Sequence, residues 1–302
     1  MNFPDFQILA KATEDIILAK YIQDDFSFLN SEEKTLNQIK REISLLKEKT
    51  SLSFLGEDFI HAETDWFIKI KQFWNIQESD NQNIIESFLH KILQSDEINL
   101  SFPNGLMGLL LRLSKENKTF KNPIIANFLN QSTKLLLSKK MIPKANWQQH
   151  SFFPEAFDSD TWTSNNILSW MVGDLHVVKF LYRQATVNLN NNYDLIAENI
   201  GMYAISRTHE EQNGITNSTF ANGSIGLVVL FQALYYETRN ENYQKASTLW
   251  LEKTKSLLEK ELQNDFYNGK ESLFLDGMAG VLYIVKAIQQ EKPKSVLTWL
   301  VG

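Results

Sequence analysis

An acidic residue and a histidine stand close together in the segment SWMVGDLHVVKFL, as Asp174 and His176. A carboxylate that orients an imidazole is a common arrangement for proton transfer, so the pair is a candidate for general acid and base catalysis. The alternative is a structural histidine inside a helical segment. The remaining histidines are scattered and form no His-Glu-x-x-His zinc motif. A zinc site improvised from His150, His176 and His209 is the weakest of these interpretations.

A second group of candidates lies in the loop NWQQHSFFPEAFDSDTWTSNNILSW, residues 146–170, which has aromatic and acidic residues but no helical period. An aromatic surface loop is suited to bind a peptide, although the same residues could pack as a lid. Glu155, Asp158 and Asp160 admit another interpretation, because glycoside hydrolases need two opposed carboxylates. Acids spaced this closely in a loop are more often solvated, so the loop is retained as a candidate peptide-contact surface.

The composition of the 302-residue chain excludes several classes of protein. There is no cysteine, so disulfides, thiolate nucleophiles and thiolate metal sites are all excluded. The 30 basic and 36 acidic residues give a net charge of −6 without a basic stripe, which argues against binding to nucleic acid. No apolar run of about 18 residues and no signal-peptide pattern occurs, so we expect a cytoplasmic protein without a transmembrane segment.

The elements that would position these residues are mainly helices. Apolar residues recur at three- and four-residue intervals, and only 12 glycines and 6 prolines interrupt the chain, so the expected class is all-α. A glycine, two residues, a second glycine and then an apolar helix occur in FPNGLMGLLLRL, FANGSIGLVVLF and FLDGMAGVLYIV. Weaker copies lie at Gly173, where His176 replaces the second glycine, and around Gly56. A recurring unit of this length indicates an array of helix pairs.

Each repeat joins two helices of different character. The helix after Gly223 is apolar nearly all round, whereas the next one, within residues 238–262, has charges on one face. We therefore expect the first helix of a pair to be buried and the second to face solvent on one side. Such pairs close most simply into a barrel of helices inside helices, with the glycine turns at one mouth. Residues 1–302 are predicted as one domain, with divergent helices in residues 1–50 and repeats in residues 52–302.

These repeats resemble those of the lanthionine synthetase C-like family. Its members read roughly G-x-x-H-G-x-x-G, S-W-C-Y-G-x-P-G, C-H-G-x-x-G and L-x-x-G-x-A-G, and this chain has SFPNGLMG, SWMVGDLH, ANGSIG and FLDGMAG in that order. The resemblance is specific from about Ser101 to Gly302. It implies an α/α toroid, here shortened at its N-terminus. It also implies a relation to cyclases that add cysteine thiols to dehydrated serines and threonines of precursor peptides.

The same resemblance indicates that the chemistry of these cyclases is lost. It implies a zinc ion held by two cysteines and a histidine, at positions that carry Met171, Ala221 and Asn222 here. A thioether, a methyl group and a neutral amide do not form a zinc site. The acid–base histidine of the family corresponds to Asn104, and an arginine of the family corresponds to Ile167. We therefore predict no zinc, no other cofactor and no cyclase activity.

Four positions remain candidates for substrate binding. Asn104, Asn222 and Asp276 each precede the first glycine of a repeat, where a side-chain oxygen can cap a helix or line a peptide-binding mouth. Trp170 keeps the tryptophan of the family and is expected to pack in the core, with a contact to substrate as the alternative.

Together these observations favour a catalytically degenerate member of the family that binds a ribosomally made precursor peptide or scaffolds its modifying enzymes. One alternative is an active enzyme whose zinc-independent site has moved to Asp174, His176 or the acidic loop. Another is a structural interaction module of a larger complex.

Overall fold

The structure, a computed structural model, describes residues 90, 93–94, 98–102, 105–143, 150–158, 161–163, 166–188, 192–270 and 275–289. These residues fall into two compact units, of which the first ends at Gly214 and the second begins at Ile215. The helices expected in residues 1–50, the repeat around Gly56 and the candidate Asn104 lie outside the described residues. The expectation of one domain over residues 1–302 stays a prediction.

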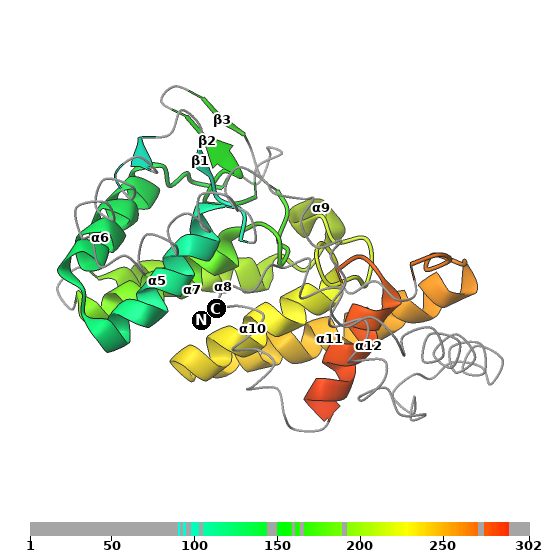
Figure 1. Ribbon diagram of the computed structural model, residues 1–302. Coiled ribbons are helices and arrows are strands. Elements are labelled where there is room, and N and C mark those ends of the chain that lie inside the picture. The colour runs from blue at the N-terminus through cyan, green and yellow to red at the C-terminus, as the bar shows by residue number, and fades with distance from the viewer. Residues whose placement is uncertain are drawn as a thin grey trace, which may run out of the picture. The chain divides into compact units, whose positions relative to one another are not determined.

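Helices make up most of the first unit (Figure 1). They are α5 (Leu106–Phe120), α6 (Pro123–Ser138), α7 (Asp174–Val187), α8 (Tyr193–Ser206) and the short α9 (Glu210–Asn213). Helix α5 packs against α6 and α7, and α7 packs against α8. Residues 174–181 of α7 are all buried, whereas α8 buries only the face that carries Ala197, Ile200 and Ala204. This contrast confirms the expected alternation of buried and one-sided helices.

A small antiparallel sheet also belongs to the first unit. Its strands, in the order in which they pair, are β1 (Ile98–Asn99), β2 (Ala156–Phe157) and β3 (Trp162–Thr163). Ile98 lies opposite Phe157, and Ala156 lies opposite Thr163. The expectation of an irregular loop over residues 146–170 is therefore wrong for its middle. Strands of two residues are too short to show the alternation of apolar and polar residues that identifies a strand in a sequence.

The second unit repeats the same contrast between a buried and an amphipathic helix. Its helices are α10 (Ser224–Thr238), α11 (Glu241–Gln263) and α12 (Met278–Gln289), and α10 packs against both of the others. Every residue of α10 from 224 to 231 is buried. Helix α11 begins after Asn240, whose side chain accepts a hydrogen bond from the Asn242 N–H, and it buries residues at intervals of three and four. The period of the sequence thus predicted both helices correctly.

In the part of the chain that the structure describes, no helix combines the length and the apolar character needed to cross a bilayer.

Candidate functional site at the glycine turns

The turn before each buried helix folds so tightly that a glycine is required. Gly105 and Gly223 occupy the N-cap positions of α5 and α10. A Cβ added to Gly105 would lie 2.6 Å from the carbonyl oxygens of Asn99 and Ser101, and one added to Gly223 would overlap the backbone N and O of Thr219. These neighbours are backbone atoms that cannot rotate away, so the glycines are needed for close approach of the preceding loop.

The two turns share more than their glycines. They read Asn99-Leu-Ser-Phe-Pro-Asn-Gly105 and Asn217-Ser-Thr-Phe-Ala-Asn-Gly223. The side-chain oxygen of Asn99 accepts the Ser101 N–H at 2.7 Å, and that of Asn217 accepts the Thr219 N–H at 3.0 Å and its hydroxyl at 2.6 Å. Sequence reasoning missed this Asn-x-Ser/Thr-Phe-x-Asn-Gly pattern because the search began at the glycine. Comparing the residues upstream of the two glycines would have found it.

Trp170 and Met171 belong to the turn that leads into α7. The Trp170 side chain is fully buried and packs edge to face against Phe102, with ring centroids 5.2 Å apart. The Phe102 N–H donates to the carbonyl oxygen of Met171 at 2.8 Å, which ties this turn to the one before α5. Trp170 therefore packs in the core, as expected, and a direct contact with substrate stays a prediction.

Asn222 and Asp276 occupy equivalent positions before Gly223 and Gly277, and both side chains are exposed. The N-cap of α10 is Gly223, one residue after Asn222, and capping of the helix by the Asn222 side chain stays a prediction. Ala221 is buried, and its N–H donates to the carbonyl oxygen of Leu275 at 2.8 Å. This bond links the α10 turn to the α12 turn and leaves the Asn222 amide at the surface of the unit.

His176 lies in the first turn of α7 and contacts the turns before α5 and α7. Its side chain is buried, its ring stacks on Phe102 with centroids 4.4 Å apart, and its Nε2 lies 2.6 Å from the carbonyl oxygen of Trp170. Burial lowers the pKa of His176 to about 3, so the ring is neutral and its Nε2–H donates to Trp170. Within the described residues, Nδ1 has no hydrogen-bond partner.

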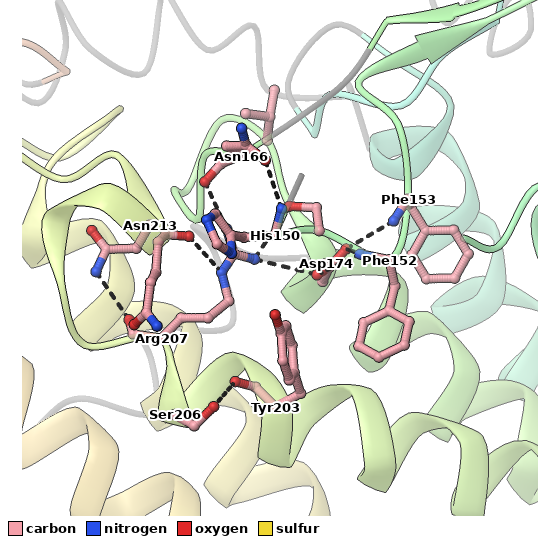
Figure 2. Close-up of polar contacts among 12 residues, drawn as sticks. His150, Phe152, Phe153, Asn166, Asp174, Tyr203, Ser206, Arg207 and Asn213 are labelled. Atoms are coloured by element: carbon pink, nitrogen blue, oxygen red, sulfur yellow. Dashed lines mark hydrogen bonds and ion pairs between the residues drawn. The ribbon is translucent and has the colours of Figure 1, made fainter. Parts of the chain in front are cut away.

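Asp174 is held by a different set of groups, shown in Figure 2. Its carboxylate accepts the backbone N–H groups of Phe152 and Phe153 at 3.0–3.1 Å and pairs with Arg207, whose Nη1 lies 3.3 Å from Oδ2. Burial raises the pKa of Asp174 to about 6, against the opposing effects of Arg207 and the two N–H groups. No hydrogen bond joins Asp174 to His176 in this described region. A catalytic role for the pair stays a prediction.

Arg207 connects this carboxylate to the surrounding loops. Its guanidinium donates to the Ser151 hydroxyl at 3.2 Å, to the Asn166 carbonyl at 2.6 Å and to the Gln212 carbonyl at 2.8 Å. Of these residues, Figure 2 labels Arg207 and Asn166. The Asp174–Arg207 pair thus anchors both ends of the loop that contains β2 and β3, and it attaches this loop to the start of α7. The acidic residue Asp158 of the same loop accepts both the N–H and the hydroxyl of Thr161, which closes its turn.

The residues that correspond to the zinc ligands do not fit the metal. Met171 offers a thioether from the first unit, and the second unit offers the buried methyl of Ala221 and the neutral amide of Asn222. Zinc prefers thiolate, imidazole or carboxylate. Among the described residues, no three histidine, aspartate or glutamate side chains come together to hold a metal, and His150, His176 and His209 form no such group.

Comparison with known proteins agrees with the repeats. The sequence model of the family described as lanthionine synthetase C-like protein matches residues 18–300. The chain belongs to this family. The match begins well before Ser101, so the region similar to the family extends further toward the N-terminus than the most specific motifs do.

A solved structure with the fold of this lanthionine synthetase C-like protein is that of nisin cyclase. The two share 14% sequence identity with a TM-score of 0.58, over 96% of this chain and 78% of the cyclase chain. This likeness confirms the expected all-α, α/α-toroid fold class. No curated protein sequence matches the chain at a significant level.

Proposed function

We propose that this lanthionine synthetase C-like protein binds a ribosomally made precursor peptide, or holds the enzymes that modify one, without closing thioether rings itself. The observation that carries the proposal is the α10 turn. The turn is held by the hydrogen bonds from Thr219 to the Asn217 side chain and by the backbone bond from Ala221 to Leu275. The side chains at positions 221 and 222, however, cannot hold zinc.

A cyclase of this family needs the metal to convert a substrate thiol into a thiolate near neutral pH. With a methyl and an amide at the matched positions, this chain has no group there to perform that step. The Asn222 side chain is exposed, and its amide is a group that can hydrogen-bond to a peptide backbone. We propose Asn222 and Asp276 as peptide contacts, and the buried Trp170 as support for the neighbouring turn.

The test uses the dehydrated precursor of nisin, because a nisin cyclase has this fold. Binding is measured by fluorescence anisotropy. Ring closure is measured by mass spectrometry as the loss of thiols that an alkylating reagent can label, because the addition itself leaves the mass unchanged. We expect binding without ring closure. Asn222→Ala should weaken binding about fivefold, because a neutral hydrogen bond contributes about 1 kcal/mol. Asn242→Ala, at an exposed position of α11, is the matched control and should leave binding unchanged.

Two results would contradict the proposal. Thioether formation by the purified protein would show a cyclase, and formation without zinc would point to the relocated site of the enzyme alternative. The peptide-binding role would be contradicted if the precursor bound with equal affinity to the wild type, to the Asn222 variant and to an unrelated helical protein.

A further inference from the structure

We infer that Glu261 and Tyr267 are positioning residues that set the conformation of the Asn217–Gly223 turn. Glu261 lies in the last turn of α11, and Tyr267 follows that helix. Oε1 of Glu261 accepts the Ser218 N–H at 2.8 Å, and Oε2 accepts the Ser218 hydroxyl and, at 2.8 Å, the Tyr267 hydroxyl. The two hydroxyl groups also contact each other. The functional consequence of this inference rests on the proposed function of the turn.

The burial of these three side chains makes the cluster energetically significant. Ser218 is fully buried, and Tyr267 and Glu261 are 4% and 8% exposed. A buried carboxylate is costly unless its oxygens accept hydrogen bonds, and here they accept three. Burial and the Glu261 carboxylate both raise the pKa of Tyr267, so the phenol keeps its proton and acts as a donor. Each partner therefore holds the other two in place.

The cluster is coupled to the exposed Asn222 through the turn itself. Ser218 stands between Asn217 and Thr219, which are joined by the side-chain bonds of the turn, and the Thr219 backbone lies against Gly223. The Ser224 N–H donates in turn to the Asn217 carbonyl at 2.9 Å. A shift of Ser218 must therefore move the segment that presents Asn222.

Helix α11 also holds the start of α10 at a separate point. The hydroxyl of Ser224 lies 2.7 Å from that of Thr254, and both are buried. This bond fixes the first turn of the helix, whereas the Glu261 cluster fixes the loop before it. Loss of the cluster should therefore loosen the loop while α10 stays docked on α11.

A single thiol can report this local loosening, because the chain has no cysteine. Ala221→Cys places one thiol at a buried position of the turn. Its labelling by Ellman's reagent, without denaturant, is compared in the Tyr267→Phe and Glu261→Gln backgrounds. Glu252→Gln is the matched control, since it makes the same change on an exposed face of α11. We expect labelling at least about tenfold faster in the first two backgrounds and unchanged in the control.

Urea unfolding of each variant separates local from global effects. The inference requires the increase in labelling to exceed the increase in the globally unfolded fraction of the same variant. An increase that equals the global change would mean a purely structural role and would overturn the inference. So would unchanged labelling in Tyr267→Phe, the milder variant, which loses a single hydroxyl.

The labelling experiment needs no peptide, so its failure differs from a failure of the proposed function. If the nisin precursor binds, Tyr267→Phe should weaken that binding several-fold, and Glu252→Gln should not. If labelling accelerates and no peptide binds, the positioning role stands and the peptide-binding proposal falls. If binding is normal and labelling is unchanged, the proposed function stands and the positioning role falls.

Discussion

Arg207 and Asp174 form an ion pair in which both side chains are buried, with 1% and 0% exposure, and 3.3 Å separates Nη1 from Oδ2. The two residues are 33 positions apart, at the end of α8 and the start of α7. Every oxygen of the carboxylate and several nitrogens of the guanidinium have further partners in the adjoining loops. The pair therefore anchors the loop of residues 150–166, and its buried polar atoms have hydrogen-bond partners.

Removal of one partner should be costly. Arg207→Met leaves the Asp174 carboxylate buried without its cation and deprives Ser151 and the Asn166 carbonyl of their donor, so the free energy of unfolding should fall by about 3–5 kcal/mol. Urea denaturation measures the change. The control is Lys255→Met, which breaks the partly exposed Lys255–Glu252 pair and should cost less than about 1 kcal/mol. Similar losses in the two variants would contradict the anchoring role.

His176 should make the protein sensitive to acid. Its pKa is about 3 in the native state against 6.5 for an ordinary histidine, because burial disfavours the charged ring. Below pH 6.5 the unfolded chain therefore binds a proton that the native state does not. Its contribution to stability is intact above that pH and is lost as the pH falls toward 3, by about 2 kcal/mol near pH 5.

The measurement compares urea unfolding of the wild type and His176→Gln at about pH 7 and about pH 5. The amide of glutamine can still donate to the Trp170 carbonyl, but it does not titrate. The advantage of the wild type should shrink by about 2 kcal/mol at the lower pH. Asp174, whose raised pKa acts in the opposite direction, is present in both proteins and cancels. An advantage that is independent of pH would show that the ring is not buried in its neutral form.

Gly223 should tolerate no side chain. Its φ of −112° is open to any residue, so the cost of Gly223→Ala arises from overlap with the Thr219 backbone, at roughly 1–3 kcal/mol or more. Gly269 offers the opposite case: φ is +77°, and among the described residues other than its chain neighbours no atom lies within 4 Å of an added Cβ. Gly269→Ala should cost about 1 kcal/mol from backbone strain alone. Thermal unfolding ranks the two, and a larger loss at Gly269 would contradict the close approach at Gly223.

Treatment with a metal chelator should leave the thermal stability of the protein unchanged. Because Met171, Ala221 and Asn222 supply no zinc ligand, we expect fewer than about 0.1 zinc ions per chain after purification, by atomic emission. Treatment with EDTA should shift the melting temperature by less than about 1 °C. A family member with cysteine, cysteine and histidine at these positions is the positive control. Stoichiometric zinc in this chain would show that other residues replace the lost ligands.

Several features of the fold and the candidate site could be read from the sequence. The helical period identified α10 and α11, their difference in character predicted which of them is buried, and the glycine repeats located the turns. The period cannot reveal strands of two residues, which is why the sheet was missed. Nor can it show that Glu261 is buried, because a glutamate among charged residues of an amphipathic helix looks solvated until its partner Ser218, 43 positions earlier, is known.

Residue type and local spacing were sufficient to identify the repeat and the family from the sequence, and they predict the loss of the zinc ligands. The partners of the ionisable groups, by contrast, depend on the tertiary structure. Adjacency in the sequence suggested that Asp174 orients His176, whereas the fold turns Asp174 to Arg207 and to the backbone of Phe152 and Phe153. Burial and hydrogen bonding depend on residues that are distant along the chain, so they exist only once the helices and loops have packed.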